Sequence, residues 1–581
     1  MTEQRLFSNQ RLIRLIIPLV IEQALTILVG MCDGVMVSSV GEAAISGVSL
    51  VDMINNVILV LFAALATGGA VVTSQFLGAR QGEKARQSAG QLVLMSAVLG
   101  VAAAALCLVF AKNLMRLFFG SIDDDVMAAG LTYLHITALS FPFIALYNAG
   151  AAIFRSVGNS KVSMQVSLLM NGINVVGNAI CIFVLKMGVA GVAVPTVVSR
   201  CVAAVVILLL AAKPNQELCL KWGAICHADG KMMGSILRIG VPNACENSLF
   251  QLGRLIVVSM IALFGTVQTS ANAVANTLDG MGIIIGQAMG LAMVTVVGQC
   301  VGAGDPEQVK YYVKKLMLWS YLSMAVCNVL IIVFVEDLIS LYSSLSPETV
   351  ELTKTLVIIH ESCAILLWAA AFVLPNALRA ANDVRFTMWV GVGSMVAFRI
   401  LGSWILCVQM EWGAMGVWIA MIIDWVCRTA FFVTRMISGK WQSKYIPSKC
   451  VAPPMDDSSA ALLWYGFSPK SGIASNRRCS PRHGKRMQQE NSIGSVRSSR
   501  EPYLWSPTSG YPLEANCTRI WWLRPVCRRM RTRLHSPAER RVNSSRAFLT
   551  PDRSRFTTYT LFFRLSFHRR SSQSPDSGGS P

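Results

Sequence analysis

Long apolar stretches constrain this sequence more than any other feature. A helix needs about 20 apolar residues to cross the hydrocarbon of a bilayer. Twelve such stretches follow one another, at roughly 14–38, 53–77, 89–110, 128–153, 163–185, 188–211, 237–263, 275–301, 316–335, 355–377, 386–408 and 413–436. A membrane barrel would instead alternate apolar and polar residues in strands of about ten residues. The chain is therefore predicted to be an all-α integral membrane protein with twelve transmembrane helices.

Composition supports a membrane protein and argues against a nucleic-acid-binding one. Hydrophobic residues make up 54% of the chain and charged residues 14%, against about 25% charged residues in soluble domains. The net charge of +20 is uneven, because residues 451–581 alone contribute about +14. We expect this basic, Arg- and Ser-rich tail, taken as 446–581, to be disordered. Its composition also raises the alternative of an altered reading frame.

Cysteine and histidine usage gives no sign of a metal, a cofactor or an enzyme. The 16 cysteines lie mostly inside apolar stretches, and no CxxC motif or Cys/His metal spacing occurs. The six histidines are scattered, whereas a membrane-embedded enzyme would need clustered histidines or a nucleophile motif. We therefore expect no cofactor and no catalytic residues, and keep an enzyme only as the alternative from another class.

Basic residues in the connecting segments predict the orientation. When both termini are placed on one side, that side receives about 21 Lys and Arg and the other side about four. Because positive loops face the cytosol, both termini are predicted to be cytosolic. The protein is expected to be a multi-pass protein of the cytoplasmic, or inner, cell membrane.

The two halves of the chain repeat with an offset of 224 residues. Pro18 and Glu22 recur as Pro242 and Glu246, and the segment 75–79 recurs at 299–303. One register over about 180 residues indicates a duplication. The predicted organisation is a bundle of six helices over 1–212, a cytosolic linker over 213–235 and a second six-helix bundle over 236–445. A pseudo-twofold axis along the membrane normal should relate the two bundles.

Polar residues inside the first predicted bundle form a candidate cation site. A charge at the middle of a spanning helix costs about 2.5–3.5 kcal/mol and usually has a function. Carboxylate, amide and hydroxyl oxygens can ligate a cation, although packing between helices is an alternative role for the amides. The candidate residues are Asp33, Asn174, Asn178 and Thr196. In the second half their places are taken by Val257, Phe398, Gly402 and Met421, so the set is specific to one copy.

Four further charged residues lie inside predicted spans and are candidates for substrate binding or gating. They are Glu22, Glu246, Arg399 and Asp424. Arg399 and Asp424 belong to the last two spans and could pair with each other. Pairing that only neutralises both charges is the alternative interpretation.

Several segments, in order, resemble the multidrug and toxic compound extrusion (MATE) transporters, bacterial branch. They are 18–37, 66–79, 375–380 and 416–421, and the resemblance covers about residues 5–445. It implies an exporter of varied drugs driven by Na⁺ or H⁺ antiport. It also implies that the first-bundle cation site consists of Asp33, Asn174, Asn178 and Thr196, with Na⁺ as the only metal ion expected there.

The sequence departs from the family pattern at two places. The DinF-like branch has a second carboxylate where this chain has Asn178, which favours Na⁺ ligation over a relay between two carboxylates. Glu246 lies about one turn before the acidic residue of the NorM-like pattern. No Asp or Glu follows Glu361 in the tenth span, which puts a NorM-type site in the second bundle in doubt.

The sequence thus predicts a cation-coupled antiporter that exports small, often cationic or lipophilic drugs and toxic compounds. Its partners would be these drug-like substrates and the lipid bilayer, with no nucleic acid, and we expect a monomer. A flippase of lipid-linked precursors is the alternative within transport, because related exporters with twelve or more spans move lipids.

Overall fold

The structure, a computed structural model, describes residues 5–444 apart from 121–122, 215–217 and 343–344. Every regular element in this range is helical. Ten helices are long and apolar enough to span a membrane, or 11 if the bent pair α4 (Asp124–Ala138) and α5 (Phe141–Val157) is one span. The remaining predicted span corresponds to α9 (Gly230–Ala262), which has 33 residues and carries three charges in its interior. The predicted all-α membrane fold is confirmed.

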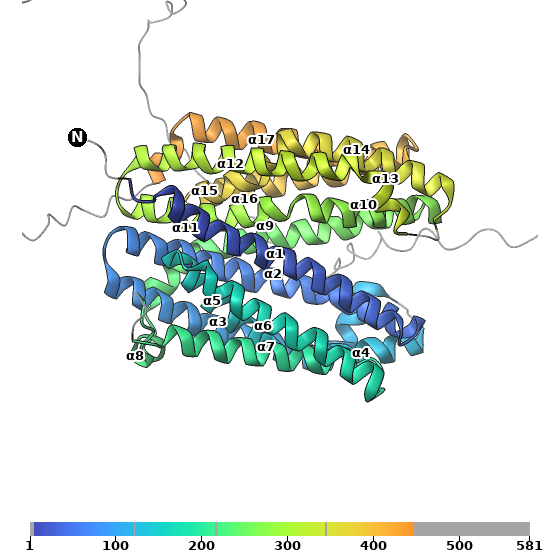
Figure 1. Ribbon diagram of the computed structural model, residues 1–581, viewed down its shortest axis with the longest axis horizontal. Helices are drawn as coiled ribbons and strands as arrows, with labels where there is room; N and C mark the ends of the chain where they lie inside the picture. Colours follow the sequence, from blue (N-terminus) through green and yellow to red (C-terminus); the bar gives the residue numbers. More distant parts are fainter. Residues whose placement is uncertain (1–4, 121–122, 215–217, 343–344, 445–581) are drawn as a thin grey trace, which may run out of the picture. The chain divides into compact units, whose positions relative to one another are not determined.

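The first bundle is formed by the helices drawn in blue to teal in Figure 1. Besides α4 and α5 it contains α1 (Asn9–Ser38), α2 (Glu42–Gly78), α3 (Gly82–Phe119), α6 (Ser160–Ala179) and α7 (Ala190–Ala211). A π-helical segment, η1 (Ile180–Val184), extends α6. Helix α1 packs on α6, α2 packs on α3 and α5, and α7 packs on α5 and α6. The pair α4–α5 bends by 48°.

The second bundle, green to orange in Figure 1, repeats this plan. Its helices are α9, α10 (Thr266–Gly282), α11 (Ile284–Gly302), α12 (Pro306–Val333), α13 (Val335–Ser340), α14 (Pro347–Trp368), α15 (Leu374–Ala380), α16 (Val384–Ser394) and α17 (Gly413–Ile437). The π-helical segments η2 (Ala369–Val373), η3 (Met395–Leu401) and η4 (Trp404–Gln409) interrupt them, and η5 (Lys440–Lys444) follows α17. Segments η1 and η4 lie at equivalent positions of the repeat, so the duplication extends to irregular helix geometry.

Equivalent residues shape the first helix of each bundle. The Ser8 hydroxyl caps α1 by accepting from the Arg11 backbone N–H at 3.2 Å, and the Asp229 carboxylate caps α9 by accepting from the Lys231 N–H at 2.9 Å. Pro18 and Pro242 lie inside α1 and α9 and remove one backbone hydrogen bond in each. Helix bending is therefore favoured at the same place in both bundles.

The bundles meet where α2 packs on α9 and α11. Two equivalent glycines permit the closest approach. A Cβ at Gly78 would stand 1.9 Å from the backbone oxygen of Gln299, and a Cβ at Gly302 would stand 1.9 Å from the backbone oxygen of Gln75. No side chain fits in that space. This reciprocal contact lies at the end of the bundles where α1 begins and α17 ends, which we call the terminal face (Figure 1).

Side-chain amides tie the two bundles together beside these glycines. Gln75 Nε2 donates to the Ala380 backbone oxygen at 2.8 Å, and Gln299 Nε2 donates to the Ser156 backbone oxygen at 2.7 Å. Both donors and both acceptors are repeat equivalents, 224 positions apart. The pseudo-twofold relation predicted from the repeat therefore passes through this contact.

Two chain segments outside the bundles also lie on the terminal face. The Phe7 backbone N–H donates to the Tyr312 hydroxyl of α12 at 2.8 Å. In the linker, Gln91 Nε2 of α3 donates to the backbone oxygens of Ala224 and His227 at 3.0 and 2.7 Å. The segment before α1 thus contacts the second bundle, and the segment before α9 contacts the first.

The predicted spans have the right order, and most of them are shorter than the helices that contain them. Helix α2 begins 11 residues before the predicted span at 53, and α12 begins ten residues before the one at 316. Hydropathy marks only the apolar centre of a helix, whereas polar and charged residues continue the helix beyond it. The linker expected over 213–235 contains a short helix, α8 (Trp222–Cys226), and α9 already begins at Gly230. The predicted tail 446–581 lies outside the described residues.

Candidate functional site

The four predicted cation-site residues come together in the first bundle. Asp33 lies on α1, Asn174 and Asn178 lie on α6, and Thr196 lies on α7. Asn178 Nδ2 donates to Asp33 Oδ1 at 2.8 Å. The hydrogen-bond network assigns the Asn174 nitrogen to the two Asp33 oxygens, at 3.0 and 3.2 Å, and the Asn174 oxygen to the Thr196 hydroxyl, at 3.0 Å. The sequence prediction that these side chains share one site is therefore matched by their contacts.

Local sequence explains how α6 and α7 present these groups. Asn174 and Asn178 are four residues apart and so lie on the same face of α6. A Cβ at Gly177 would stand 2.7 Å from Pro195 Cβ, so the glycine permits the close approach of α7. Thr196 directly follows that proline. The polar groups of both helices are thereby held toward α1.

The site contains an oxygen atom that has no partner in this arrangement. Asn178 is fully buried, and its Oδ1 accepts no hydrogen bond from any described residue. Asp33 is half-buried and receives only amide donors. A primary amide offers either donors or an acceptor, according to its orientation. If the two amides turned, their oxygens would join the Asp33 carboxylate and Thr196 in a set suited to a monovalent cation.

A second polar layer beside the site was not predicted from the sequence. Asp52 on α2 accepts from the Tyr133 hydroxyl at 3.2 Å and from Asn55 Nδ2 at 3.4 Å. Arg200 on α7 donates to the Ser140 hydroxyl at 2.7 Å. Both charged groups are close enough to act electrostatically on Asp33. The available signal was a charge within a helix, but Asp52 fell one residue outside the predicted span, and Arg200 was overlooked inside its span.

Glu22, predicted to serve in substrate binding or gating, is held in a buried network apart from the Asp33 contacts. Arg155 Nη1 lies 3.2 Å from Glu22 Oε1, and the Ser163 hydroxyl donates to Glu22 Oε2 at 2.9 Å. The Tyr147 hydroxyl lies 3.4 Å from Oε1. The network therefore joins α1 to α5 and α6 and leaves few free acceptor positions on the carboxylate.

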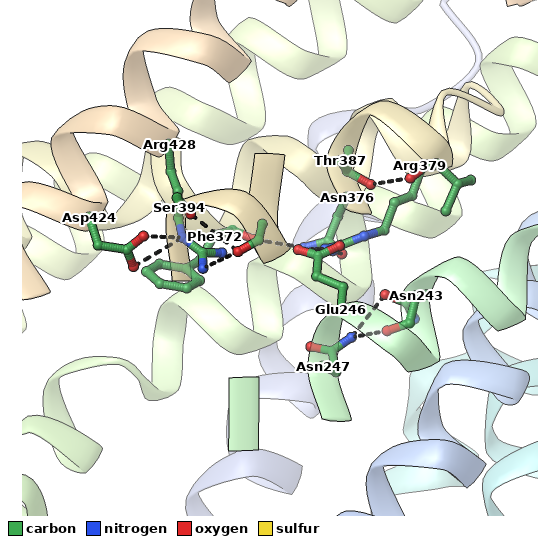
Figure 2. Close-up of polar contacts among 12 residues, drawn as sticks. Asn243, Glu246, Asn247, Phe372, Asn376, Arg379, Thr387, Ser394, Asp424 and Arg428 are labelled. Carbon is green, nitrogen blue, oxygen red and sulfur yellow. Dashed lines mark hydrogen bonds and ion pairs between the residues drawn. The ribbon is translucent and has the colours of Figure 1, made fainter. Parts of the chain in front are cut away.

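Glu246 makes the equivalent ion pair in the second bundle (Figure 2). Arg379 Nη2 donates to Glu246 Oε1 at 2.8 Å, and Arg379 Nη1 donates to Asn376 Oδ1 at 2.9 Å. Glu246 and Arg379 are the repeat equivalents of Glu22 and Arg155. A pair kept in both bundles favours a structural role, since the Asp33 site is not repeated.

Asp424 and Arg399 do not form the ion pair considered from the sequence. Asp424 instead pairs with Arg428 one turn later on α17, at 3.0 Å, as Figure 2 shows. Arg428 also donates to the Gly391 backbone oxygen at 3.0 Å. The Arg399 guanidinium lies over the Phe250 ring, 5.2 Å from its centroid. The i, i+4 spacing of Asp424 and Arg428 was a signal for the local pair.

Comparison with known proteins agrees with the repeat and the fold. A family profile described as MatE matches residues 18–180 and 242–405, more than half of the chain. The two matches begin at Pro18 and Pro242, in the register of the repeat. No name or structure is needed to see this register, because the offset is visible in the sequence.

Curated relatives match over most of their length. The chain is 28% identical over 435 residues to the "Uncharacterized transporter YisQ" of Bacillus subtilis, covering 74% of this chain and 94% of the relative. It is 25% identical over 445 residues to the "Probable multidrug resistance protein NorM" of Thermotoga maritima, covering 75% and 94%.

Solved structures show the same fold. One is described as "Outward-facing conformation of a multidrug resistance MATE family transporter of the MOP superfamily"; it matches with a TM-score of 0.69 at 20% identity, covering 75% of this chain and 96% of that chain. Another, "Crystal structure of MATE in complex with MaD3S", matches with a TM-score of 0.69 at 21% identity, covering 75% and 97%.

Proposed function

This chain belongs to the MATE family of multi-pass membrane transporters, and from that premise we propose that it exports small, drug-like compounds in exchange for Na⁺ or H⁺. The observation that carries the proposal is the convergence of Asp33, Asn174, Asn178 and Thr196 in one bundle only. Relatives named as multidrug resistance proteins, such as NorM of Thermotoga maritima, support the substrate class.

Coupling requires that the cation bind one conformation more tightly than the other. In the arrangement described here, amide N–H groups of Asn174 and Asn178 bond to the Asp33 carboxylate. A Na⁺ ion would replace these donors, and both amides would have to turn their oxygens inward. A proton on Asp33 would likewise leave a hydroxyl that seeks an acceptor, such as Asn178 Oδ1. Either ion therefore changes how α1 and α6 are tied together.

Transport also requires the two bundles to separate at one face and close at the other. Here they are in contact at the terminal face through Gly78 and Gly302. The bias of Lys and Arg toward that face supports a cytosolic position for it. In this proposal the described state is closed to the cytosol, the coupling ion enters from outside, and export begins when the glycine contact opens.

The test is gradient-driven efflux by an Asp33→Asn variant in vesicles. The substitution keeps the size of the side chain and most of its hydrogen bonding but removes the charge that the cation neutralises. We expect normal insertion and loss of efflux under both Na⁺ and H⁺ gradients. Glu83→Gln removes an exposed carboxylate and serves as the matched control, with efflux unchanged. Normal gradient-driven efflux by Asp33→Asn would refute the proposed coupling site.

The orientation has its own test. A reporter active only in the cytosol, inserted near 213–235 or 440–449, should be active. The same positions should give no signal with a reporter that works only outside the cytosol. The reverse pattern would invert the assignment of the terminal face.

A further inference from the structure

A second cluster of polar side chains lies in the second bundle, at a place that has no counterpart in the first. Asp279 lies on α10, Asn328 on α12, and His360 and Glu361 on α14. Asn328, His360 and Glu361 are fully buried, and Asp279 is 19% exposed. Three helices therefore bring two carboxylates, an imidazole and an amide together inside the bundle.

The spacing of these groups differs from that of hydrogen-bonded partners. His360 Nδ1 lies 3.5 Å from Asp279 Oδ1 and 3.6 Å from Glu361 Oε1, and neither contact is a hydrogen bond. One ligand atom from each of the three residues lies within 4.8 Å of the others. Ligands about 2.0–2.2 Å from a tetrahedral metal ion are about 3.3–3.5 Å apart. The two imidazole–carboxylate distances are close to that separation.

Asn328 provides an independent sign that the cluster encloses a ligand position. It is 0% exposed, and neither atom of its amide has a hydrogen-bond partner among the described residues. A Cβ at Gly282 would stand 2.9 Å from Asn328 Oδ1 and 2.8 Å from Glu361 Oε2. The amide oxygen and the carboxylate therefore face the same point beside Gly282, where the glycine leaves room.

The charge of the cluster also needs compensation. Within the described part of the chain, the only ion-pair partner of Asp279 and Glu361 is His360. Leaving buried carboxylates uncompensated costs several kcal/mol each, and a membrane interior makes this worse. A divalent cation would balance two carboxylates, and the amide oxygen of Asn328 would complete a set of four donors.

Aromatic rings fix the imidazole that would bind the ion. The His360 ring packs against Trp418 and Trp425 of α17, with both centroid distances at 4.7 Å. Trp418 is itself held by a hydrogen bond from Nε1 to Asn272 Oδ1, at 3.0 Å. Groups that orient a ligand in this way are a regular part of metal sites.

The repeat shows that the cluster is specific to one bundle. The positions equivalent to Asp279, Asn328, His360 and Glu361 hold Asn55, Ala104, Ile136 and Thr137. A structural requirement of the fold would favour similar residues in both bundles, as it does for the pair Glu22 and Arg155. The cluster therefore resembles the Asp33 site in being a feature of a single copy.

We propose that Asp279, Asn328, His360 and Glu361 bind one divalent transition-metal ion in the second bundle. The imidazole nitrogen favours an ion such as Zn²⁺, Mn²⁺ or Co²⁺ over Na⁺, Mg²⁺ or Ca²⁺, which select oxygen ligands. Asp279, the only partly exposed member, lies at the C-terminal end of α10, where the helix breaks before α11. It is the first ligand that an entering ion meets.

The test uses Co²⁺ as the probe and the full-length protein without a histidine tag. Protein stripped with a chelator is dialysed against Co²⁺, bound metal is measured, and the absorption spectrum is recorded. We expect one equivalent with the spectrum of an ion bound by nitrogen and oxygen. His360→Gln and Glu361→Gln should each weaken Co²⁺ binding by at least about 10–100-fold, the loss typical of changes one step further from a metal.

Two further variants keep the test decisive. Gly282→Ala retains every ligand but places a Cβ against two of them, so it should also weaken binding even where a ligand variant folds poorly. His135→Gln removes an exposed histidine of α4 and should bind Co²⁺ like the wild type. Wild-type uptake no greater than that of the double variant His360→Gln/Glu361→Gln would overturn the proposal and leave protons as the occupants of the cluster.

The result is independent of the coupling site in the first bundle. Asp33→Asn should bind Co²⁺ normally, because Asp33 belongs to the other bundle. Absence of metal binding would therefore leave the proposed exchange of drugs for Na⁺ or H⁺ untouched.

Discussion

The two bundles have the same frame and different polar interiors. Each contains one buried Glu–Arg pair at equivalent positions, Glu22 with Arg155 and Glu246 with Arg379. The remaining carboxylates differ between the copies. The first bundle has Asp33 among amides, whereas the second has an imidazole-containing cluster around Glu361 on different helices.

This difference separates two kinds of buried charge. A paired charge that recurs in both copies joins equivalent helices and has its counter-charge within the protein. A carboxylate found in one copy, with no basic side chain paired to it, must take its compensation from a bound ion or proton. The comparison predicts that the first kind affects stability and that the second affects ion binding.

The largest expected effect comes from breaking the repeated ion pairs. Arg155→Ala and Arg379→Ala each leave a buried glutamate without its partner, which should lower the free energy of unfolding by about 3–5 kcal/mol. The measurement is unfolding of the purified protein in detergent. Arg86→Ala breaks a pair in which Glu83 is exposed and should cost at most about 1 kcal/mol.

Similar losses in the two bundles would sharpen the comparison. If one of these arginine variants kept its stability but lost export, that pair would be a gating device, as the sequence alone had suggested for Glu22 and Glu246. The assignment of both pairs to the frame would then be wrong for that bundle.

A smaller effect is expected where the bundles touch. Gly78→Ala and Gly302→Ala each place a Cβ 1.9 Å from a backbone oxygen of the other bundle, and overpacking of this kind costs about 1–3 kcal/mol. The glycine contact should therefore open more often and expose Cys300, which is buried beside Gln299. Alkylation of Cys300, followed by mass spectrometry of peptides, should become faster.

Internal controls exist for this measurement. Cys407 is buried away from the contact, and its alkylation should not change. Gly234→Ala meets no atom within 4 Å and should leave Cys300 protected. Unchanged alkylation of Cys300 in both glycine variants would show that the contact does not control opening of the terminal face.

The frame could be predicted from the sequence because its signals are local or repeated. Apolar stretches predicted the helices, and the offset of 224 residues predicted two equivalent bundles. The Asp33 site could be predicted because Asn174 and Asn178 share a helix face and the family resemblance supplied the other positions. Hydropathy could not give the helix ends, since charged and polar residues extend the helices past the membrane.

Contacts among distant helices were harder to predict. Arg399 was considered as a partner of Asp424, but Arg428 on the same helix is closer and needs no second helix. The cluster around Glu361 requires Asp279 and Asn328 from two other helices, and no spacing along the chain reveals that convergence. Only the presence of charged groups inside predicted spans pointed to these places.

The smallest expected effect distinguishes a ligand from its neighbours within the first-bundle site. Asn178→Ala removes a fully buried amide whose oxygen is unpartnered and whose nitrogen bonds to Asp33. Asp33 keeps its charge, so coupling should survive with weaker cation binding, by about tenfold or 1.4 kcal/mol. Efflux measured over a series of Na⁺ concentrations should therefore recover at high Na⁺ if Na⁺ is the ion. Asn171→Ala is the matched control, because Asn171 lies on the same helix but bonds only weakly to Ser167, at 3.5 Å. An equal Na⁺ requirement for the two variants would mean that Asn178 holds the helices together and does not ligate the ion, which would leave Asp33 as the sole distinguishing feature of the first bundle.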